Sequence, residues 1–324
     1  MINRLCALIA LACLAFGSTI AQAQSYPSKI ITIVAPSAPG GITDTLARLL
    51  AQHFSEAWGQ LAIVENKPGA NHQIGAELVA RSAPDGYTLF VSPEATFVVN
   101  PSLYAKLAYD PVKDFVPISG LVSIQHSLIV NPSLPVRNVG DLIELAKQKP
   151  GQLTYGTFGI GSSGHINMEM FQTMAGVKFL PIHYKGATPA LTDVIGGHIQ
   201  MMFLSVGSAM PSVRAGKVNM IAIGSKARMP QLPDVPTVAE SGLAGFEAVS
   251  WFGLFAPGGT PQEIVNKINA EVKKIFSDPD FRQKFLEPQF MEPMMSSPEE
   301  FAEYVRTDLQ KWSRVMRAAN VKIQ

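Results

Sequence analysis

The chain has 324 residues, 47% of them hydrophobic and 16% charged, and its 26 basic side chains nearly balance 25 acidic ones. A nearly neutral chain without a Lys/Arg cluster lacks the electrostatic footprint of a protein that binds nucleic acid or an anionic membrane. A chain of this length usually forms two domains and buries enough surface to need no disulfide.

Residues 1–23 read as a secretory signal peptide. A basic start is followed by an apolar run over residues 5–16 and by Ala-Gln-Ala, the pattern of a cleavage site after Ala23. The apolar run is too short to span a bilayer. Because both cysteines, Cys6 and Cys13, lie in this segment, we expect a mature periplasmic protein without a thiol.

Downstream, short apolar runs rich in β-branched residues alternate with longer stretches of helical periodicity. This alternation is typical of α/β proteins, in which crossover helices join parallel strands. The predicted strands are 29–35, 61–65, 87–92, 153–158, 178–183, 199–204 and 218–224. The predicted helices are 43–57, 71–82, 138–149, 163–176, 186–196, 207–215, 261–277 and 298–318.

Two segments, 115–132 and 246–261, are long and apolar and lack a flanking helix on one side. We interpret them as strands that cross between two α/β lobes. Lobe 1 then combines residues 24–124 with 249–324, and lobe 2 spans 125–248. Two lobes on two crossing strands form a hinge with a ligand cleft between them. Loops at the carboxyl ends of the strands are expected to face that cleft.

The first candidate site is the loop in IVAPSAPGGITDTLAR (33–48). Pro and Gly residues lead into a predicted helix, so unpaired backbone N–H groups at its positive end can hold an anion. The loop lacks the Gly-Lys-Ser/Thr ending of a P-loop. A plain strand-to-helix turn is the alternative. The candidate ligand-binding residues are Ser37, Pro39, Gly40, Gly41, Thr43 and Asp44.

A second loop lies in YGTFGIGSSGHINMEMF (155–171). Its glycines match the spacing of a dinucleotide-binding loop, but no acid follows about 20 residues later to hold a ribose hydroxyl, so NAD is not expected. Serine hydroxyls and a helix start near Gly164 indicate a second polar or anion site. The candidates are Phe158, Gly159, Ser162, Ser163 and His165.

A third loop, in HYKGATPALTDVIGG (183–197), places a basic side chain beside a predicted helix start. Its candidate ligand-binding residues are Lys185, Gly186 and Ala187. The alternative is that Lys185 is solvated and only Gly186 matters, for the turn.

The residue types argue against catalysis. The mature chain offers no cysteine nucleophile, and the segment GSSGH departs from the G-x-S-x-G pattern because His165 replaces the last glycine. The six histidines form no H-x-x-x-H or H-E-x-x-H pattern. We expect no enzyme activity, no metal and no cofactor. A serine hydrolase using Ser162 or Ser163 with His165 stays an alternative, although a capping or packing histidine is favoured.

Six segments together closely resemble the periplasmic substrate-binding receptors of tripartite tricarboxylate transporters, the Bug receptors. They are APGGITDTLAR (38–48), VENKPGANHQIGAELVARSAPDGYTL (64–89), YGTFGIGSSGHINMEMF (155–171), IHYKGATPALTDVIGGHIQMMF (182–203), LPDVPTVAESG (232–242) and WFGLFAPGGTP (251–261). The resemblance implies a type II periplasmic-binding fold whose lobes close over one small carboxylate without catalysis. It also implies delivery to a permease with a large and a small membrane subunit. We expect a monomer.

The resemblance further implies that backbone amides and ordered water hold the ligand carboxylate in the loop matching Pro39, Gly40 and Gly41. A grip made of amide dipoles, without a lysine, permits release when the lobes open. A receptor of this kind that serves as the sensing partner of a membrane signalling kinase would need the same binding domain, so that role stays an alternative.

Two departures from the family pattern bear on the ligand. Asn71 and His72 stand where many members have Gly-Gly, and Leu204 stands where many have an acid, which argues against an amino-acid ligand. Phe158, Phe203 and Leu204 are expected to form an apolar wall between polar ends. Such a wall favours a carboxylate with an apolar or aromatic middle, such as an aromatic mono- or dicarboxylate.

Overall fold

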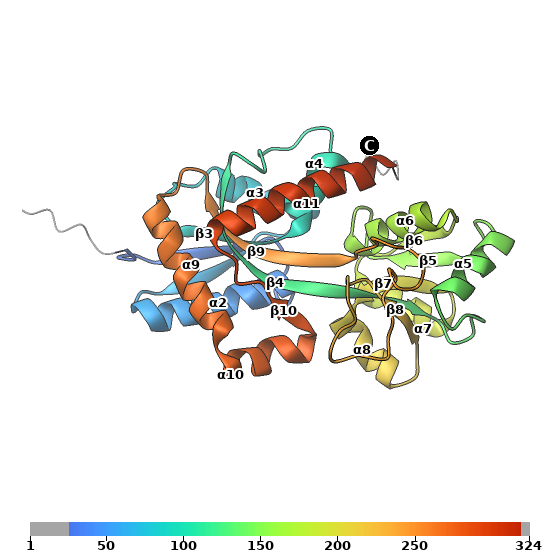
Figure 1. Ribbon diagram of the computed structural model, residues 1–324. Helices are drawn as coiled ribbons and strands as arrows, with labels where there is room; N and C mark the ends of the chain where they lie inside the picture. Colours follow the sequence, from blue (N-terminus) through green and yellow to red (C-terminus); the bar gives the residue numbers. More distant parts are fainter. Residues whose placement is uncertain (1–25, 319–324) are drawn as a thin grey trace, which may run out of the picture.

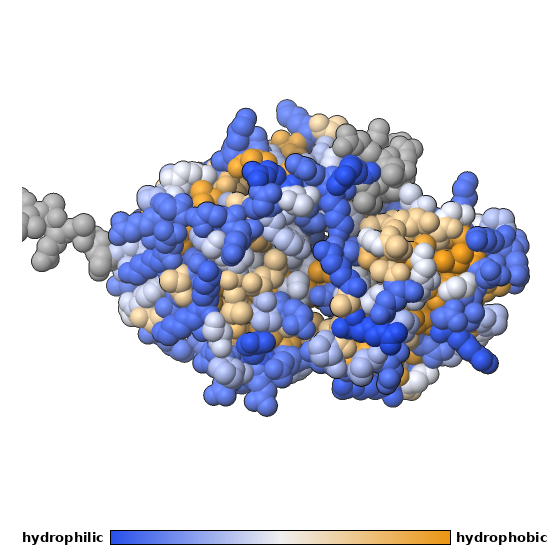
Figure 2. All heavy atoms as spheres, viewed as in Figure 1, coloured by the Kyte–Doolittle hydropathy of each residue, from blue (hydrophilic) through white to orange (hydrophobic). Residues whose placement is uncertain are grey.

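The computed structural model describes residues 26–318 and consists of two α/β lobes joined by long strands (Figure 1). The predicted signal peptide lies outside the described residues. Among residues 26–318, no helix is both long enough and apolar enough to cross a membrane. On the face seen in Figure 2, hydrophilic residues predominate and the lobes meet along a narrow seam.

Lobe 1 contains the first half of a continuous sheet. Its strand order is β2 (Ala62–Asn66), β1 (Ile31–Ala35), β3 (Thr88–Pro93), β9 (Val249–Pro257) and β4 (Phe115–Val130), and β10 (Met291–Pro293) also pairs with β4. β1 is parallel to β2 and β3, whereas β9 is antiparallel to β3 and β4. The loops that follow β1, β2 and β3 therefore leave the same edge of the sheet.

β4 and β9 are the two predicted crossing strands. The first part of β4, from Phe115 to Gln125, pairs with β9. Its second part, from His126 to Val130, lies in lobe 2 between β7 (Met201–Ser205) and β8 (Asn219–Ile223). β5 (Thr154–Thr157) and β6 (Leu180–His183) complete this half of the sheet in parallel pairing. The prediction of two α/β lobes on crossing strands is confirmed.

The helices lie where their hydrophobic periodicity predicts them. Lobe 1 carries α2 (Ile42–Trp58), α3 (Gln73–Ala80), α4 (Asn100–Leu103), α9 (Gln262–Ser277), α10 (Pro279–Phe281) and α11 (Pro298–Ala318). Lobe 2 carries α5 (Val139–Gln148), α6 (Ser163–Ala175), α7 (Ala187–Gly196) and α8 (Val206–Arg214). Shorter 3₁₀ or π turns are η1 (Ala70–His72), η2 (Ala95–Val99), η3 (Arg282–Leu286) and η4 (Glu287–Gln289). The sequence prediction missed η2 and α4, which form a short, mostly apolar stretch without a clear helical period. It also missed the short elements between α9 and α11, namely α10, η3, η4 and β10.

Each lobe has its own hydrophobic core, but the C-terminal segment touches both lobes. α11 runs along lobe 1 and contacts α6 of lobe 2 (Figure 1). Lys311 of α11 donates a hydrogen bond to Glu247 at 3.0 Å, just before β9. Phe290, which precedes β10, packs with Val206 and Met210 of lobe 2. The predicted lobe boundaries stay a prediction, because this C-terminal segment contacts both lobes.

Candidate functional site

The loop after β1 is organised around the buried carboxylate of Asp44. Its Oδ2 accepts hydrogen bonds from Gly40 N–H at 2.9 Å and Arg48 Nε at 3.0 Å. Its Oδ1 accepts from Asn66 Nδ2 at 2.9 Å and lies 3.0 Å from the Arg48 guanidinium. Burial by itself would raise the pKa of this carboxyl, but the hydrogen bonds outweigh burial and lower its pKa. Asp44 is therefore charged at neutral pH.

The predicted ligand-binding roles of the two loop glycines and of Asp44 stay predictions, but several of their polar groups already have partners within the loop. Gly40 N–H donates to Asp44, and Gly41 N–H donates to Ala38 O at 3.3 Å, so both amides already have partners within the loop. Asp44 shapes the loop. The donors left for an anion are the N–H groups in the first turn of α2, which has no side-chain cap.

The other predicted residues of this loop divide by exposure. The hydroxyls of Ser37 and Thr43 hydrogen-bond to each other, and Thr43 is buried. Pro39 is exposed. Gly40 has a φ of 87°, a left-handed conformation that glycine adopts freely, and it lies at the exposed crest of the loop.

In lobe 2, the loop between β5 and α6 is held by Ser162 and His165. Ser162 caps α6, because its Oγ accepts from His165 N–H at 3.4 Å, and it donates to Gly159 O at 2.7 Å. The Nδ1 atom of His165 accepts from Gly161 N–H at 3.1 Å. Burial, with His183 nearby, lowers the pKa of His165 to about 4, so the ring is neutral as an accepting Nδ1 requires.

These bonds contradict the catalytic pair that the sequence left as an alternative. A nucleophilic serine needs a base that accepts its proton. The ring acceptor of His165 is taken by Gly161 N–H, and the hydroxyl of Ser162 donates to a backbone carbonyl. His165 is thus a packing histidine, as favoured from the sequence. Ser163 is half-buried at the start of α6, and Phe158 is half-buried against Gly164.

The third predicted loop lies beside the second, because β5 and β6 are neighbouring parallel strands. Thr157 Oγ1 and His183 Nδ1, 2.8 Å apart, join the two strand ends. Gly186 precedes α7 without a side-chain cap, and Ala187 begins the helix. Lys185 is exposed next to this helix start. The ammonium of Lys185 and the uncapped N–H groups of α7 can bind the same anion.

The predicted contribution of Phe203 and Leu204 to an apolar ligand wall stays a prediction, but both side chains lie in the core of lobe 2. β7 lies inside the lobe 2 sheet, between β4 and β5, and successive side chains point to opposite faces. Phe203 stacks on Phe246 with ring centroids 5.6 Å apart, and Leu204 belongs to a cluster with Ile129. Helices cover both faces, so both residues are buried in the core. The preference for an aromatic ligand rested on this wall and likewise stays a prediction.

The loop after β2 ends in a left-handed turn that the sequence did not predict. Ala70, Asn71 and His72 have φ values of 46°, 48° and 74°. This conformation costs a residue other than glycine about 1–2 kcal/mol, although Asn tolerates it better than most. The departure from Gly-Gly at Asn71 and His72 therefore places two side chains on a backbone that glycine would adopt freely.

A buried polar network at the crossing strands was also missed. Glu94, between β3 and η2, accepts hydrogen bonds from Ser250 Oγ at 2.7 Å and Trp251 N–H at 3.3 Å. His126 Nε2 of β4 lies 2.9 Å from the same Ser250 Oγ. Burial raises the pKa of Glu94 to about 7 and lowers the pKa of His126 to about 4. The sequence signal was one acid in an otherwise apolar segment, but its partners come from distant strands.

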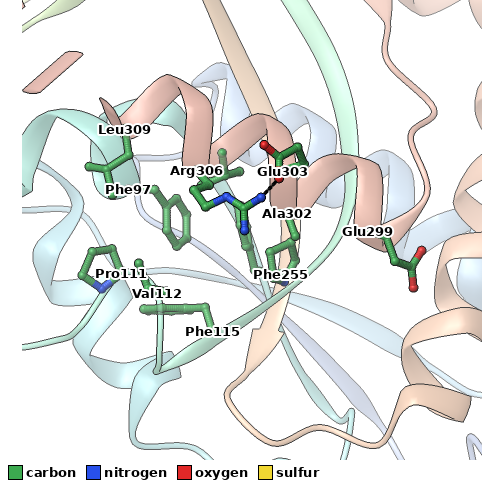
Figure 3. A pocket seen from close by; sticks show the side chains of 12 residues that line it. Phe97, Pro111, Val112, Phe115, Phe255, Glu299, Ala302, Glu303, Arg306 and Leu309 are labelled. Carbon is green, nitrogen blue, oxygen red and sulfur yellow. Dashed lines mark ion pairs between the residues drawn. The ribbon is translucent and has the colours of Figure 1, made fainter. Parts of the chain in front are cut away.

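A separate apolar cavity of about 420 Å³ lies in lobe 1 beneath α11 (Figure 3). Phe97, Phe115 and Phe255 form its walls, and Arg306 at its rim is paired with Glu303. It contains none of the residues predicted to bind ligand.

The two lobes, the crossing strands and the loops at the strand ends define a receptor of the periplasmic-binding type. The family model described as "Tripartite tricarboxylate transporter family receptor" matches residues 46–321, and the chain belongs to this family. Protein BugT of Bordetella pertussis is 32% identical over 304 residues, which cover 94% of this chain and 93% of BugT. The predicted Bug receptor family is confirmed.

Solved structures agree with this assignment. R. palustris Rpa4515 with adipate is 35% identical and aligns over 92% of this chain and all of its own, with a TM-score of 0.82. MatC (Rpa3494) from Rhodopseudomonas palustris with bound malate is 33% identical over 90% of this chain and 99% of its own, with a TM-score of 0.77. The periplasmic-binding fold is therefore confirmed.

Proposed function

We propose that this protein is a periplasmic receptor that closes its lobes over a small organic carboxylate and delivers it to a tripartite tricarboxylate-type membrane permease. Family membership carries the proposal, because receptors of similar structure hold adipate and malate. Recognition without chemical conversion is the role that fits such a receptor.

The donors at the strand ends support a carboxylate. α2 and α7 begin without side-chain caps, so each offers unpaired N–H groups and the positive end of a helix dipole. Such a terminus stabilises a charged group by about 0.3–1 kcal/mol. Lys185 adds one exposed cation beside α7. Several modest donors, rather than one strong ion pair, allow the ligand to leave when the lobes open.

Thermal unfolding and calorimetry with a defined panel test the ligand class. We would use adipate, malate and terephthalate, with glucose as an uncharged control. A carboxylate that binds the folded state should raise the melting temperature in a concentration-dependent way. If glucose or another neutral solute shifts the melting temperature while no organic acid does, the carboxylate assignment fails.

Delivery to a permease needs a separate experiment in cells. A strain that lacks the protein should lose uptake of the carboxylate that binds, while expression of the uptake genes stays inducible. Normal uptake together with lost induction would assign the protein to sensing instead.

Substituting Gly40 with leucine is expected to weaken ligand binding at least about tenfold, a loss of about 1.4 kcal/mol, because the new side chain would stand at the exposed crest beside the uncapped start of α2 and obstruct a ligand there. A Cβ at Gly40 would meet no atom within 4 Å, so a bulky side chain has room, but the φ of 87° is unfavourable for it. We expect only about 1–2 kcal/mol of lost folding stability. Calorimetry with the carboxylate that binds and urea unfolding measure the two effects.

Gly151→Leu is the matched control, because Gly151 has a φ of 70° with no atom within 4 Å of a Cβ and follows α5 in lobe 2. It should lose similar stability and bind normally. Normal binding by the Gly40 variant would mean that this loop is only a turn.

A further inference from the structure

The strained turn of η1 is held in place by a buried hydrogen-bond network. Asn71 Nδ2 donates to Asn100 Oδ1 at 2.6 Å, and Asn100 Nδ2 donates back to Asn71 O at 2.8 Å. Asn100 is fully buried at the start of α4, and its Nδ2 also lies 3.2 Å from the hydroxyl of Tyr109. Tyr109 in turn donates to Thr96 O at 2.6 Å. A network anchored on the buried side chains of Asn100 and Tyr109 keeps an unfavourable backbone in one conformation.

The turn lies at the part of lobe 1 that faces lobe 2. It follows β2, and β2 ends at the same sheet edge as β1 with its loop. The next helix touches that loop, since a Cβ on Gly75 would lie 3.0 Å from Pro36 Cβ. On the other side, α4 reaches lobe 2, since a Cβ on Gly161 would lie 2.5 Å from Leu103 Cδ2. The η1 turn therefore lies next to α3, which touches the first candidate loop, and next to α4, which touches the second.

His72 has an unexplained polar atom in this turn. Its Nδ1 is buried, and within residues 26–318 it has no hydrogen-bond partner. Burial lowers the pKa of His72 to about 4, so the imidazole is neutral at pH 7 and can carry its one proton on Nδ1. Buried polar atoms nearly always have a partner, so an orphan in a native structure needs an explanation.

We propose that His72 is a specificity-determining residue, which donates a hydrogen bond from Nδ1 to an oxygen of the bound carboxylate. The inference rests on the proposed function. A strained backbone held rigid by Asn71 and Asn100, an orphan buried donor, and a position between the two lobes together point to this role. A neutral donor selects for an oxygen at one place along the ligand without adding a charge that would slow release.

The experiment compares His72→Gly with Ala70→Gly. Both substitutions place glycine on a left-handed backbone, so both should keep the melting temperature of the ligand-free protein close to wild type or raise it. Calorimetry with adipate, malate and terephthalate then measures binding. We expect His72→Gly to weaken the preferred carboxylate about tenfold or more, as for loss of a hydrogen bond to a charged group, and to flatten the preference among the three. Ala70→Gly should bind like wild type.

The outcomes separate the two proposals. If wild type binds one of the three acids and His72→Gly binds it with the same affinity and preference, His72 has no role in specificity and water satisfies Nδ1. If Ala70→Gly loses as much affinity as His72→Gly, the backbone conformation sets the affinity and the imidazole contact is wrong. If wild type binds none of the three acids but binds glucose or another neutral solute, the proposed function itself fails, and His72 donates to no carboxylate.

Discussion

Replacing Asp44 with alanine is expected to release the loop after β1 and to weaken carboxylate binding by more than about tenfold. The change removes the acceptor used by Gly40 N–H and Asn66 Nδ2. Gly40 N–H lies at the exposed crest and can bond to water, so the cost falls mainly on Asn66 Nδ2, which keeps its bond to Ser37 O but loses its other acceptor. A buried polar group without a partner costs about 1–3 kcal/mol. The lost attraction to Arg48 adds little, because that side chain is 56% exposed and its charge is screened by water. We expect the free energy of unfolding to fall by about 2–3 kcal/mol in urea titrations.

The control for this variant is Glu77→Ala. Glu77 pairs with Arg81 across the same i,i+4 spacing at 2.6 Å, but the side chains are 38% and 73% exposed. Its loss should lower the free energy of unfolding by no more than about 0.5 kcal/mol and leave ligand binding unchanged. Equal losses in the two variants would mean that Asp44 is an ordinary surface partner and not the anchor of the loop.

Glu94→Gln is expected to change how stability depends on pH. Burial raises the folded-state pKa of Glu94 to about 7 from its ordinary value of 4.5. Between these two values the folded state holds a proton that the unfolded state has lost, so the free energy of unfolding falls as pH rises. This difference between the two pKa values corresponds to roughly 3 kcal/mol of folding stability. That contribution is fully present below pH 4.5 and is lost as pH rises through 7. Glutamine cannot ionise, so the free energy of unfolding of the variant should rise relative to that of wild type as pH increases across this range.

Urea unfolding of wild type and Glu94→Gln at pH 4.5, 6 and 8 measures the effect. The buried histidines act in the opposite direction in both proteins, since burial lowers the pKa of His72, His126 and His165 to about 4 and each favours folding as pH rises toward 6.5. Subtracting the free energy of unfolding of wild type from that of Glu94→Gln at each pH removes these shared contributions. Parallel stability curves would show that folding does not raise the pKa of Glu94.

The main strands and helices, and with them the α/β class, could be predicted from the sequence because each kind of element has its own spacing of hydrophobic residues. The crossing strands were recognisable for the same reason, as long apolar runs that no helix follows on one side. The missed elements are all short, and the conformation of η2 and α4 depends on the aromatic side chains around them. Phe97 of η2, for example, stacks on Phe255 of β9 with ring centroids 3.9 Å apart.

The candidate site was predicted in part. The three loops were found because Pro and Gly between a strand and a helix mark a strand end, and His165 was rightly favoured as a packing residue. The buried positions of Asp44, Phe203 and Leu204 were not foreseen, and their roles toward a ligand stay predictions. A local pattern does not show that Asp44 meets Asn66, or that helices cover both faces of β7.

The sequence by itself determined the fold class, the family and the loops from which the site is built, because these depend on local periodicity and on motifs in order along the chain. Only the tertiary structure decided which polar groups are already paired. Glu94, His126 and Ser250 come from three segments, and the left-handed turn at His72 is held by Asn100. Hydrogen bonds between distant segments leave no periodic signal in a sequence, so the free donors and acceptors become visible only once the chain is folded.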